Sequence, residues 1–422
     1  MRPGLRMRDV IFVSRQRLVG ATNGSSSYLL QLAAAVRRAG CIPHLVQPSP
    51  TLLGRYPLLR LGPEMRVFAT HRIRGVVRLG DWIVSLDPRI YADAARALVS
   101  MIARRIGVRS AWARDRPRPY AIALPWTGKD RAFVRRHGRG AEAVIADYMF
   151  QAEAFGEVEV PRSRTAIVMH DLFHSRQPSG AADSVAIVGR LEEVNMLSRA
   201  GAVIAIQQRE AEFVRRNIIG TQVVLAPMAA EPAPAAQPGA PDRILFVGSR
   251  TAPNSDGLRW FLDHVWPTVA ERRPDVVLEV AGSVCHDFAS RPSRDVRFLG
   301  LVKDLDALYR RAGVVISPLR FGSGLKVKLV EAMSKGKAVV ASDVTLQGVE
   351  ALCGPSVARA DDAVQFADRI IALLADAGAR QSLGEAALLV ARNDFSAQAA
   401  HREFEEWLTS ADPPPTAQVI RR

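Results

Sequence analysis

The stretch VVISPLRFGSGLKVKLVEAMSKGKAVVAS, residues 314–342, decides the fold of this chain. Its pattern predicts a buried strand over 314–316, a turn with Gly322 and Gly324, a helix from about Leu325 to Ser334, and a buried strand over 338–341. Two parallel strands joined by a helix require a right-handed crossover. The stretch therefore predicts a βαβ unit of a parallel sheet.

The glycine-rich turn before this helix is suited to binding an anion. It leaves backbone N–H groups free and places the positive end of the helix dipole at the carboxyl edge of the sheet. Lys326 and Lys328 add positive charge there, and Glu331 lies about two turns inside the helix. A phosphate group is the expected guest.

Length and composition predict a folded protein of two domains. A chain of 422 residues is too long for one core, and 48% hydrophobic residues is ordinary for a globular protein. No run of 18 apolar residues occurs, and the apolar run Val10–Val13 is too short for the core of a signal peptide. The 3 cysteines are far apart in the sequence and indicate neither a disulfide framework nor a zinc site. We expect no metal site.

Positive charge is concentrated in the first third of the chain. Residues 1–140 contain 26 Lys and Arg against 7 Asp and Glu, whereas the remaining residues contain 31 against 35. This asymmetry indicates an anionic partner: nucleic acid, an acidic lipid surface or an anionic substrate. A solvated arginine-rich surface without a partner explains it equally well. Nucleic acid is disfavoured, because aromatic residues make up 6% of the chain and no stacking module is present.

The first half repeats the strand, glycine turn and helix of the opening stretch. Val10 to Ser14 is predicted as a strand, and the run Gly24-Ser25-Ser26-Ser27 leads into a helix that ends near Arg38. Tyr91 to Ile106 has the pattern of a basic amphipathic helix. Such a helix can lie on a membrane surface, but we expect it to pack its apolar side on its own domain.

A Pro/Ala-rich run over 227–241 is the clearest linker, and a new strand begins after it. The alternation of strands and helices predicts an α/β protein with two Rossmann-like domains whose strand ends face a shared cleft. The expected units are an acceptor domain, a linker, a donor domain, a crossover helix and a disordered tail, at 1–228, 229–241, 242–395, 396–410 and 411–422.

From Ile244 to Glu350 the chain resembles the nucleotide-binding half of retaining glycosyltransferases of the group 1, or family 4, type. The resemblance depends on an ordered set of short motifs: FVGS at 246–249, PN at 253–254, LRWFL at 258–262, FLG at 298–300, SPLRFG at 317–322, KLVEAM at 328–333 and GKAVVAS at 336–342. The first half is similar more loosely, through Asn23-Gly24 and through the strand that ends in His170-Asp171.

The resemblance implies the GT-B fold, with a last helix that crosses back to the first domain. It implies transfer of a sugar from a nucleotide-diphosphate sugar to an acceptor hydroxyl, with retention of configuration and without another cofactor. It places Glu331 on the ribose hydroxyls and His170 at the sugar or the reacting centre. The donor diphosphate would meet backbone or cationic groups of three glycine-containing turns, namely Gly24, Gly248, Arg250, Gly324, Leu325 and Lys326.

The chain departs from the family pattern at two places. Many members carry two glutamates eight positions apart, but here Ser323 stands eight positions before Glu331. The usual arginine and lysine pair for the diphosphate is also irregular, since Arg250 is one place beyond the common arginine position and Asn254 stands near that of the lysine. Lys326 would compensate for both.

Each predicted site residue also has a purely structural interpretation. Glu331 could simply pair with Lys328 or Lys335 on the helix surface. His170 could be a structural histidine, and Gly24 could be only a turn glycine. We favour the functional reading for Glu331 and Lys326, and leave His170 and Gly24 open.

The favoured function is a cytoplasmic glycosyltransferase of polysaccharide or glycolipid synthesis, with a glycan or lipid-linked acceptor. The basic first domain would bring it to the anionic inner face of a membrane as a peripheral protein. The alternative is a degenerate GT-B protein that binds a nucleotide sugar or a glycan-synthesis partner without turnover. A sugar-nucleotide epimerase is a weaker third candidate.

Overall fold

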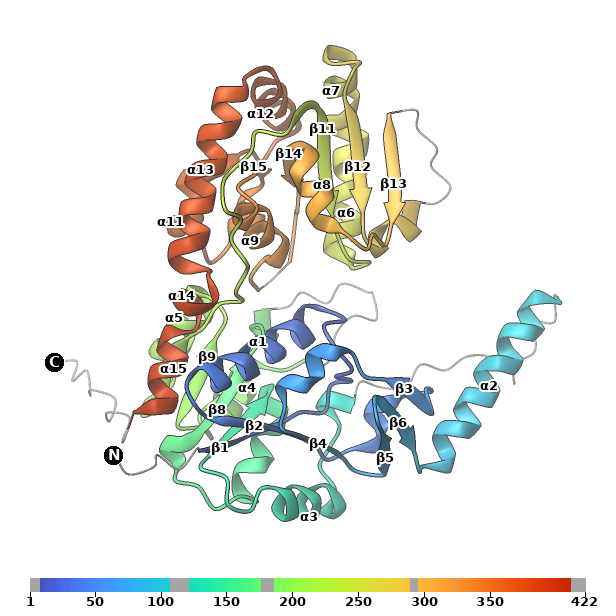
Figure 1. Cartoon of the computed structure of the whole chain (residues 1–422), viewed down its shortest axis with the longest axis vertical. Coiled ribbons are helices and arrows are strands. Elements are labelled where there is room, and N and C mark those ends of the chain that lie inside the picture. The colour runs from blue at the N-terminus through green and yellow to red at the C-terminus, as the bar shows by residue number, and fades with distance from the viewer. Residues whose placement is uncertain (1–7, 107–120, 176–185, 289–294, 323, 411–422) are drawn as a thin grey trace.

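The computed structural model describes residues 8–106, 121–175, 186–288, 295–322 and 324–410. Figure 1 shows two α/β domains, one above the other, with the chain crossing between them along one side. The expected tail at 411–422 and Ser323 lie outside the described residues.

The first domain is built on a parallel sheet of seven strands in the order β10-β9-β8-β7-β1-β2-β4. The strands are β1 (Asp9–Val13), β2 (Ile42–Gln47), β4 (Thr70–Ile73), β7 (Ala143–Asp147), β8 (Thr165–Met169), β9 (Ala202–Ala205) and β10 (Gln222–Leu225). Its helices are α1 (Gly24–Arg38), α3 (Gly128–His137), α4 (Arg190–Leu197) and α5 (Gln208–Asn217). Every residue of β7, β8 and β9 is buried, as expected for parallel strands covered by helices on both faces.

The second domain has a parallel sheet of six strands in the order β13-β12-β11-β14-β15-β16. They are β11 (Ala240–Val247), β12 (Val277–Ala281), β13 (Val296–Gly300), β14 (Ala312–Ser317), β15 (Ala338–Ala341) and β16 (Ala358–Arg359). The helices are α6 (Ala252–Trp260), α7 (Trp266–Arg272), α8 (Leu305–Arg311), α9 (Val327–Ser334), α10 (Asp343–Leu346), α11 (Glu350–Cys353), α12 (Ala363–Ala375) and α13 (Ala377–Asp394). The opening stretch of the sequence thus forms β14, α9 and β15 at the middle of this sheet.

The end of the chain returns to the first domain through α14 (Ala397–Ala400) and α15 (Arg402–Thr409). The outgoing linker and this returning segment lie against each other, because the Ala230 N–H donates to the carbonyl of Phe395 over 2.8 Å. The predicted fold class, two Rossmann-like domains with a C-terminal crossover helix, is confirmed.

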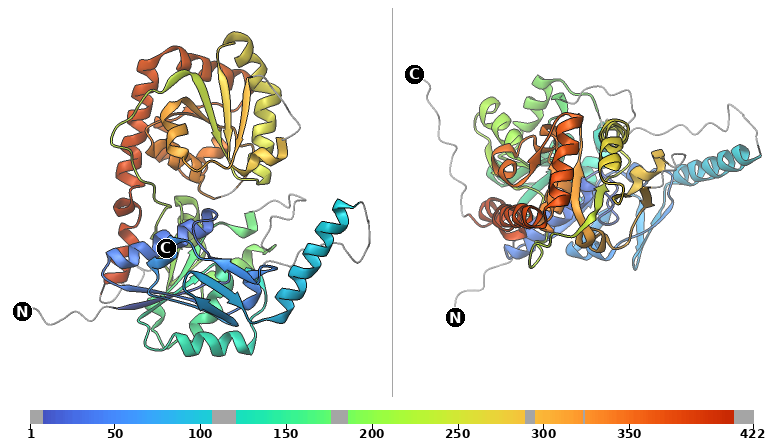
Figure 2. Two further views of the ribbon diagram at one scale, coloured as in Figure 1. Left: turned by 45° about the vertical axis from the view of Figure 1, so that its right-hand side comes forward. Right: turned by 90° about the horizontal axis from the view of Figure 1, so that it is seen from above.

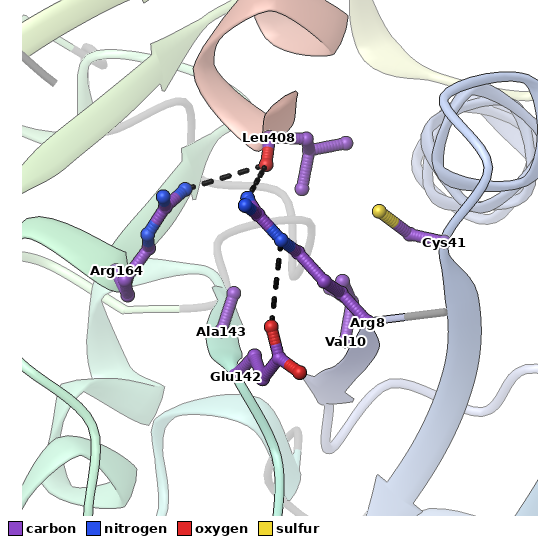
Figure 3. A pocket seen from close by; sticks show the side chains of 7 residues that line it. All are labelled: Arg8, Val10, Cys41, Glu142, Ala143, Arg164 and Leu408. Atoms are coloured by element: carbon purple, nitrogen blue, oxygen red, sulfur yellow. Dashed lines mark hydrogen bonds and ion pairs between the residues drawn. The ribbon is translucent and has the colours of Figure 1, made fainter. Parts of the chain in front are cut away.

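Two arginines of the first domain hold the carboxyl end of α15. Arg8 donates from Nη1 to the carbonyl oxygen of Leu408 over 3.0 Å, and Arg164 does so over 3.3 Å. Both arginines line a small cavity of about 250 Å³, in which Arg8 also pairs with Glu142 (Figure 3). Cations are favourable at a helix carboxyl end, where the last carbonyls lack partners within the helix.

Helix α9 begins at Val327, two residues later than predicted. The reason is the backbone of the glycine turn, in which Gly322 has φ +132° and Gly324 has φ +72°. Neither value is compatible with a right-handed helix, so Leu325 belongs to the turn and Lys326 is the residue that caps the helix.

Between β2 and α3 the chain forms an additional unit that the pattern did not predict. It contains a three-stranded antiparallel sheet, β3 (Leu58–Arg60), β5 (Val76–Leu79) and β6 (Trp82–Ser85), followed by α2 (Pro88–Arg105). The helix exists as predicted, but the expectation that its apolar side packs on the domain is wrong. Figures 1 and 2 show α2 extending away from both large sheets, and Leu98, Met101 and Ile102 are exposed. None of the described helices is long and apolar enough to cross a membrane.

Candidate active site at the domain junction

The carboxyl ends of β14 and β8 meet where the two domains touch. A Cβ atom placed on Gly324 would lie 3.5 Å from the carbonyl oxygen of His170 and 3.8 Å from Oδ1 of Asp171. Gly324 follows β14 in the second domain, and His170 and Asp171 follow β8 in the first. The structure therefore brings together two segments that the sequence nominated independently.

His170 is held in place by a carboxylate and two aromatic rings. Its Nε2 lies 2.7 Å from Oδ1 of Asp147, which is fully buried at the end of β7. The imidazole stacks on Tyr148, with 4.1 Å between ring centroids, and meets the edge of Tyr28 at 5.6 Å. The other carboxylate oxygen of Asp147 accepts hydrogen bonds from Ser14 and Gln16. Because Asp147 is fixed from three sides, the orientation of the imidazole is fixed as well.

Tyr148 has a backbone conformation that side chains rarely adopt, with φ +70° and ψ +151°. This region is almost restricted to glycine and costs about 1–3 kcal/mol. The strained backbone places the ring on His170, while the phenol donates to Oγ of Ser25 over 2.9 Å. Tyr148 thus connects the histidine to the first turn of α1, which Gly24 begins.

Gly24 itself is in the predicted place, but the backbone does not require a glycine there. Its φ is not positive, and a Cβ atom would meet nothing within 4 Å. Asn23 caps the helix by accepting from the N–H of Ser26. The contribution of Gly24 to donor binding stays a prediction.

Lys326 is the buried cation at this junction. Its ammonium donates to the carbonyl of Gly324 over 2.7 Å. Burial lowers its pKa from 10.5 to about 8, while the carboxylates of Asp171 and Glu210 oppose that shift. Both carboxylates belong to the first domain, so the lysine of the second domain lies in an electrostatic contact between the two. It remains mostly protonated at neutral pH and can offset part of the negative charge of a bound anion.

Glu210, which the sequence analysis did not nominate, is the second unusual group. Its carboxylate is buried near the start of α5 and accepts from Nε2 of Gln207 over 3.0 Å, while its Oε2 has no hydrogen-bond partner among the described residues. Burial raises the pKa of Glu210 to about 7. Gln207 in turn packs on the second domain, because a Cβ atom at Gly348 would lie 2.6 Å from its side-chain Cδ.

The raised pKa of Glu210 predicts a pH-dependent stability. Glu210 releases its proton near pH 4.5 in the unfolded chain but only near pH 7 in the folded protein. The free energy of unfolding therefore decreases as the pH rises from 4.5 to 7, and is constant above that. Glu210→Gln, which stays neutral, should be more stable than the wild type at pH 8 by on the order of 2 kcal/mol and similar to it near pH 4.5. Chemical denaturation at both pH values measures this, with exposed Glu212→Gln on the same helix as control. An equal difference at both pH values would contradict the prediction.

The other predicted diphosphate ligands lie on the turn after β11. Gly248 is required by packing, because a Cβ atom would lie 2.8 Å from the ring of Phe246. Arg250 donates from Nε to Asp287 over 2.6 Å, and its side chain is 63% exposed. No described contact joins Arg250 to Lys326, so its place in the reaction stays a prediction. Asn254 donates to the carbonyl of Ser249 and closes the same turn.

Glu331 pairs with the ammonium of Lys328, the arrangement that a structural role predicts. Its carboxylate is also near the buried phenol of Tyr309. Burial, together with the charge of Glu331, raises the pKa of Tyr309 well above its usual value. Both neighbours leave Glu331 partly exposed on α9. The ribose role stays a prediction. Leu325 is buried in the turn, so its backbone rather than its side chain is the part that could meet a donor.

The two parallel sheets and the junction of their carboxyl edges define a GT-B protein. HepE of Anabaena in complex with UDP has the same fold, with a TM-score of 0.58 at 16% identity over 95% of this chain and 99% of that one. Residues 241–376 match the family model "Glycosyl transferases group 1". This match lies within the second domain, in the part of the chain where the sequence motifs indicated the resemblance.

Two curated relatives match shorter segments. An uncharacterised 44.6 kDa protein in the cps region of Klebsiella pneumoniae is 30% identical over 139 residues, which are 30% of this chain and 36% of the relative. A phosphatidyl-myo-inositol mannosyltransferase of Mycobacterium tuberculosis is 38% identical over 107 residues, which are 24% of this chain and 28% of the relative. The matches thus span about a third of each relative's length.

Proposed function

We propose that this chain is a retaining glycosyltransferase that moves a sugar from a nucleotide-diphosphate sugar to an acceptor hydroxyl, in polysaccharide or glycolipid synthesis. The observation that carries the proposal is the junction itself, where Lys326 and the glycine turn of one domain meet His170 of the other. Negative charge grows on the leaving diphosphate in the transition state. A buried lysine beside a glycine turn is an arrangement that stabilises such charge without a bound metal.

The comparisons support the donor and acceptor classes only by analogy. The HepE structure contains UDP, which favours a nucleoside diphosphate as leaving group. The mannosyltransferase relative is named for a phosphatidyl-inositol acceptor, which favours a lipid-linked acceptor. We propose that the reaction takes place in the cytoplasm, at the inner membrane face. In this scheme the donor sits against the second domain, and the first domain presents the acceptor.

The donor is identified by thermal shift against a panel of nucleoside diphosphates and their sugars, because a bound ligand stabilises the fold by mass action. Turnover is then measured as release of nucleoside diphosphate with lipid extracts as acceptor. Retention is checked from the anomeric proton of the product by NMR. Binding of no donor in the panel would overturn the proposal.

Glu331→Ala should weaken donor binding by about 10- to 100-fold, the cost of losing hydrogen bonds to a charged group. Glu385→Ala is the control, since Glu385 is an exposed carboxylate that pairs only locally with Gln381 on α13. Titration of the best donor by calorimetry compares the two. Unchanged donor affinity in Glu331→Ala would remove the ribose role and leave Glu331 as the helix-surface partner of Lys328.

A degenerate binding protein is the second candidate, and the serine at position 323 motivates it. It predicts donor binding in the thermal-shift panel without release of nucleoside diphosphate under any acceptor condition. The two measurements together therefore separate an enzyme from a binder.

A further inference from the structure

The exposed apolar side chains of the described residues are concentrated in the additional unit between β2 and α3. The largest group lies on α2, where Leu98 is 54% exposed, Ile102 is 50% exposed and Ile106, just past the helix, is 69% exposed. Isolated exposed leucines are ordinary, but a contiguous apolar patch marks an interaction site.

The α2 side chains form one stripe. At 100° per residue, Tyr91, Leu98 and Ile102 fall within about 40° of one direction, and Val99 continues the stripe. Arg89 and Arg96 lie on the opposite side. Such a helix normally buries its apolar stripe against its own domain, yet α2 extends away from both large sheets (Figure 2). The stripe therefore lacks a cover within the described part of the chain.

The small sheet that precedes α2 carries further exposed apolar side chains. Cross-strand partners lie on the same face, and the pairs Leu79 with Trp82 and Leu58 with Val84 place four apolar side chains on one face. Leu58, Leu79 and Trp82 are all exposed. Leu86, also exposed, joins this sheet to α2. We call the sheet face and the α2 stripe together the apolar surface of the additional unit.

Basic side chains accompany this surface. Residues 51–106 contain 10 arginines against 4 acidic residues. Arg60 shares the sheet face with Leu58, and Arg105 flanks the α2 stripe. Exposed apolar side chains that include Trp82 and are flanked by Arg60 and Arg105 match the interface of an anionic bilayer, where apolar groups enter the acyl boundary and arginines meet phosphates.

We propose that the apolar surface of the additional unit docks the protein on an anionic lipid bilayer, with α2 lying in the plane of the interface. A second copy of the chain is the competing occupant. It is less favoured, because a two-fold contact would bring like-charged arginines of both copies together. Only the purpose, access to a lipid-linked acceptor, depends on the proposed function; the docking does not.

Flotation of the full chain with vesicles tests the docking. The wild type should float with phosphatidylcholine vesicles that contain phosphatidylglycerol at low salt, float less at high salt, and stay unbound with phosphatidylcholine alone. Leu98→Ser/Ile102→Ser should lower the partition coefficient by at least about tenfold. The matched control, Val364→Ser/Leu389→Ser, changes two apolar residues on α12 and α13 that are at least as exposed, and should bind as the wild type does.

Several outcomes decide the proposal. It is overturned if the wild type does not float with anionic vesicles at low salt, or if the α2 variant binds them as well as the control does. Light scattering that reveals a dimer lost in the α2 variant assigns the surface to a second copy and also overturns it. The thermal shift produced by UDP, measured without vesicles, should be the same in both variants. Failure of that shift in every variant would count against the proposed function and not against the docking.

Discussion

Lys326→Met is expected to lower the rate of sugar transfer by about 10²- to 10³-fold, the usual cost of removing one preorganised donor at a developing charge. The ammonium is buried beside the glycine turn, where it donates to the carbonyl of Gly324 and faces the carboxylates of Asp171 and Glu210 in the first domain. Single-turnover rates at saturating donor measure the effect, because they separate chemistry from binding.

The chain offers a matched control in Lys337→Met. Lys337 is also buried, donates to the carbonyl of Gln237 over 2.8 Å, and has a pKa lowered by burial to about 8. It precedes β15 and so lies at the opposite, amino edge of the sheet. Its replacement should change thermal stability but leave the transfer rate within about threefold of the wild type, in line with the absence of charge development there. Equal losses in both variants would mean that Lys326 acts only through folding.

His170→Ala is expected to reduce transfer by a comparable factor of about 10²–10³. Asp147→Asn should have a smaller effect, on the order of tenfold, because the imidazole remains but loses the carboxylate that orients it. The ratio of the two effects distinguishes a catalytic histidine from a structural one. A structural pair would lose stability in both variants, with no change in the rate of the folded fraction.

His174→Gln is the control for the histidine. His174 lies four residues further on and pairs with the buried Glu193 through Nδ1 over 2.6 Å, so it has the same chemistry in a different place. It should keep the wild-type rate. If His174→Gln lowers the rate as much as His170→Ala does, then the strand end as a whole, not the reacting position of His170, is responsible.

Local periodicity was enough to predict β14, α9 and β15, since the two strands are short apolar runs and α9 is an amphipathic helix between Gly324 and Gly336. It could also nominate Lys326 and His170, because both follow strands whose carboxyl ends share one edge. It could not find Glu210, whose special character comes from burial against the other domain. That burial is a tertiary property, which no neighbour in the sequence records.

The sequence places Asp147 at the end of a predicted strand, a position that fits two different roles. A carboxylate after a strand is more often a turn cap, and only the 2.7 Å contact with His170 decides between the two roles. The error about α2 has a different cause. Amphipathic periodicity indicates that one side of a helix must be covered, but it carries no information on whether the cover is the same domain, another copy or a lipid surface.

The hydrogen bond between Ala230 and Phe395 has a mechanical consequence. The chain crosses between the domains twice, and both crossings lie side by side on one edge of the molecule. Because the two domains are connected at two adjacent points on one edge, one domain cannot twist freely against the other. It can bend about that edge as about a hinge. Docking of α15 on the first domain fixes the second crossing to that domain and so makes the hinge edge stiff. Bending about this edge would move Gly324 of the second domain toward or away from His170 of the first, and the donor proposed above would enter the junction while the two are apart.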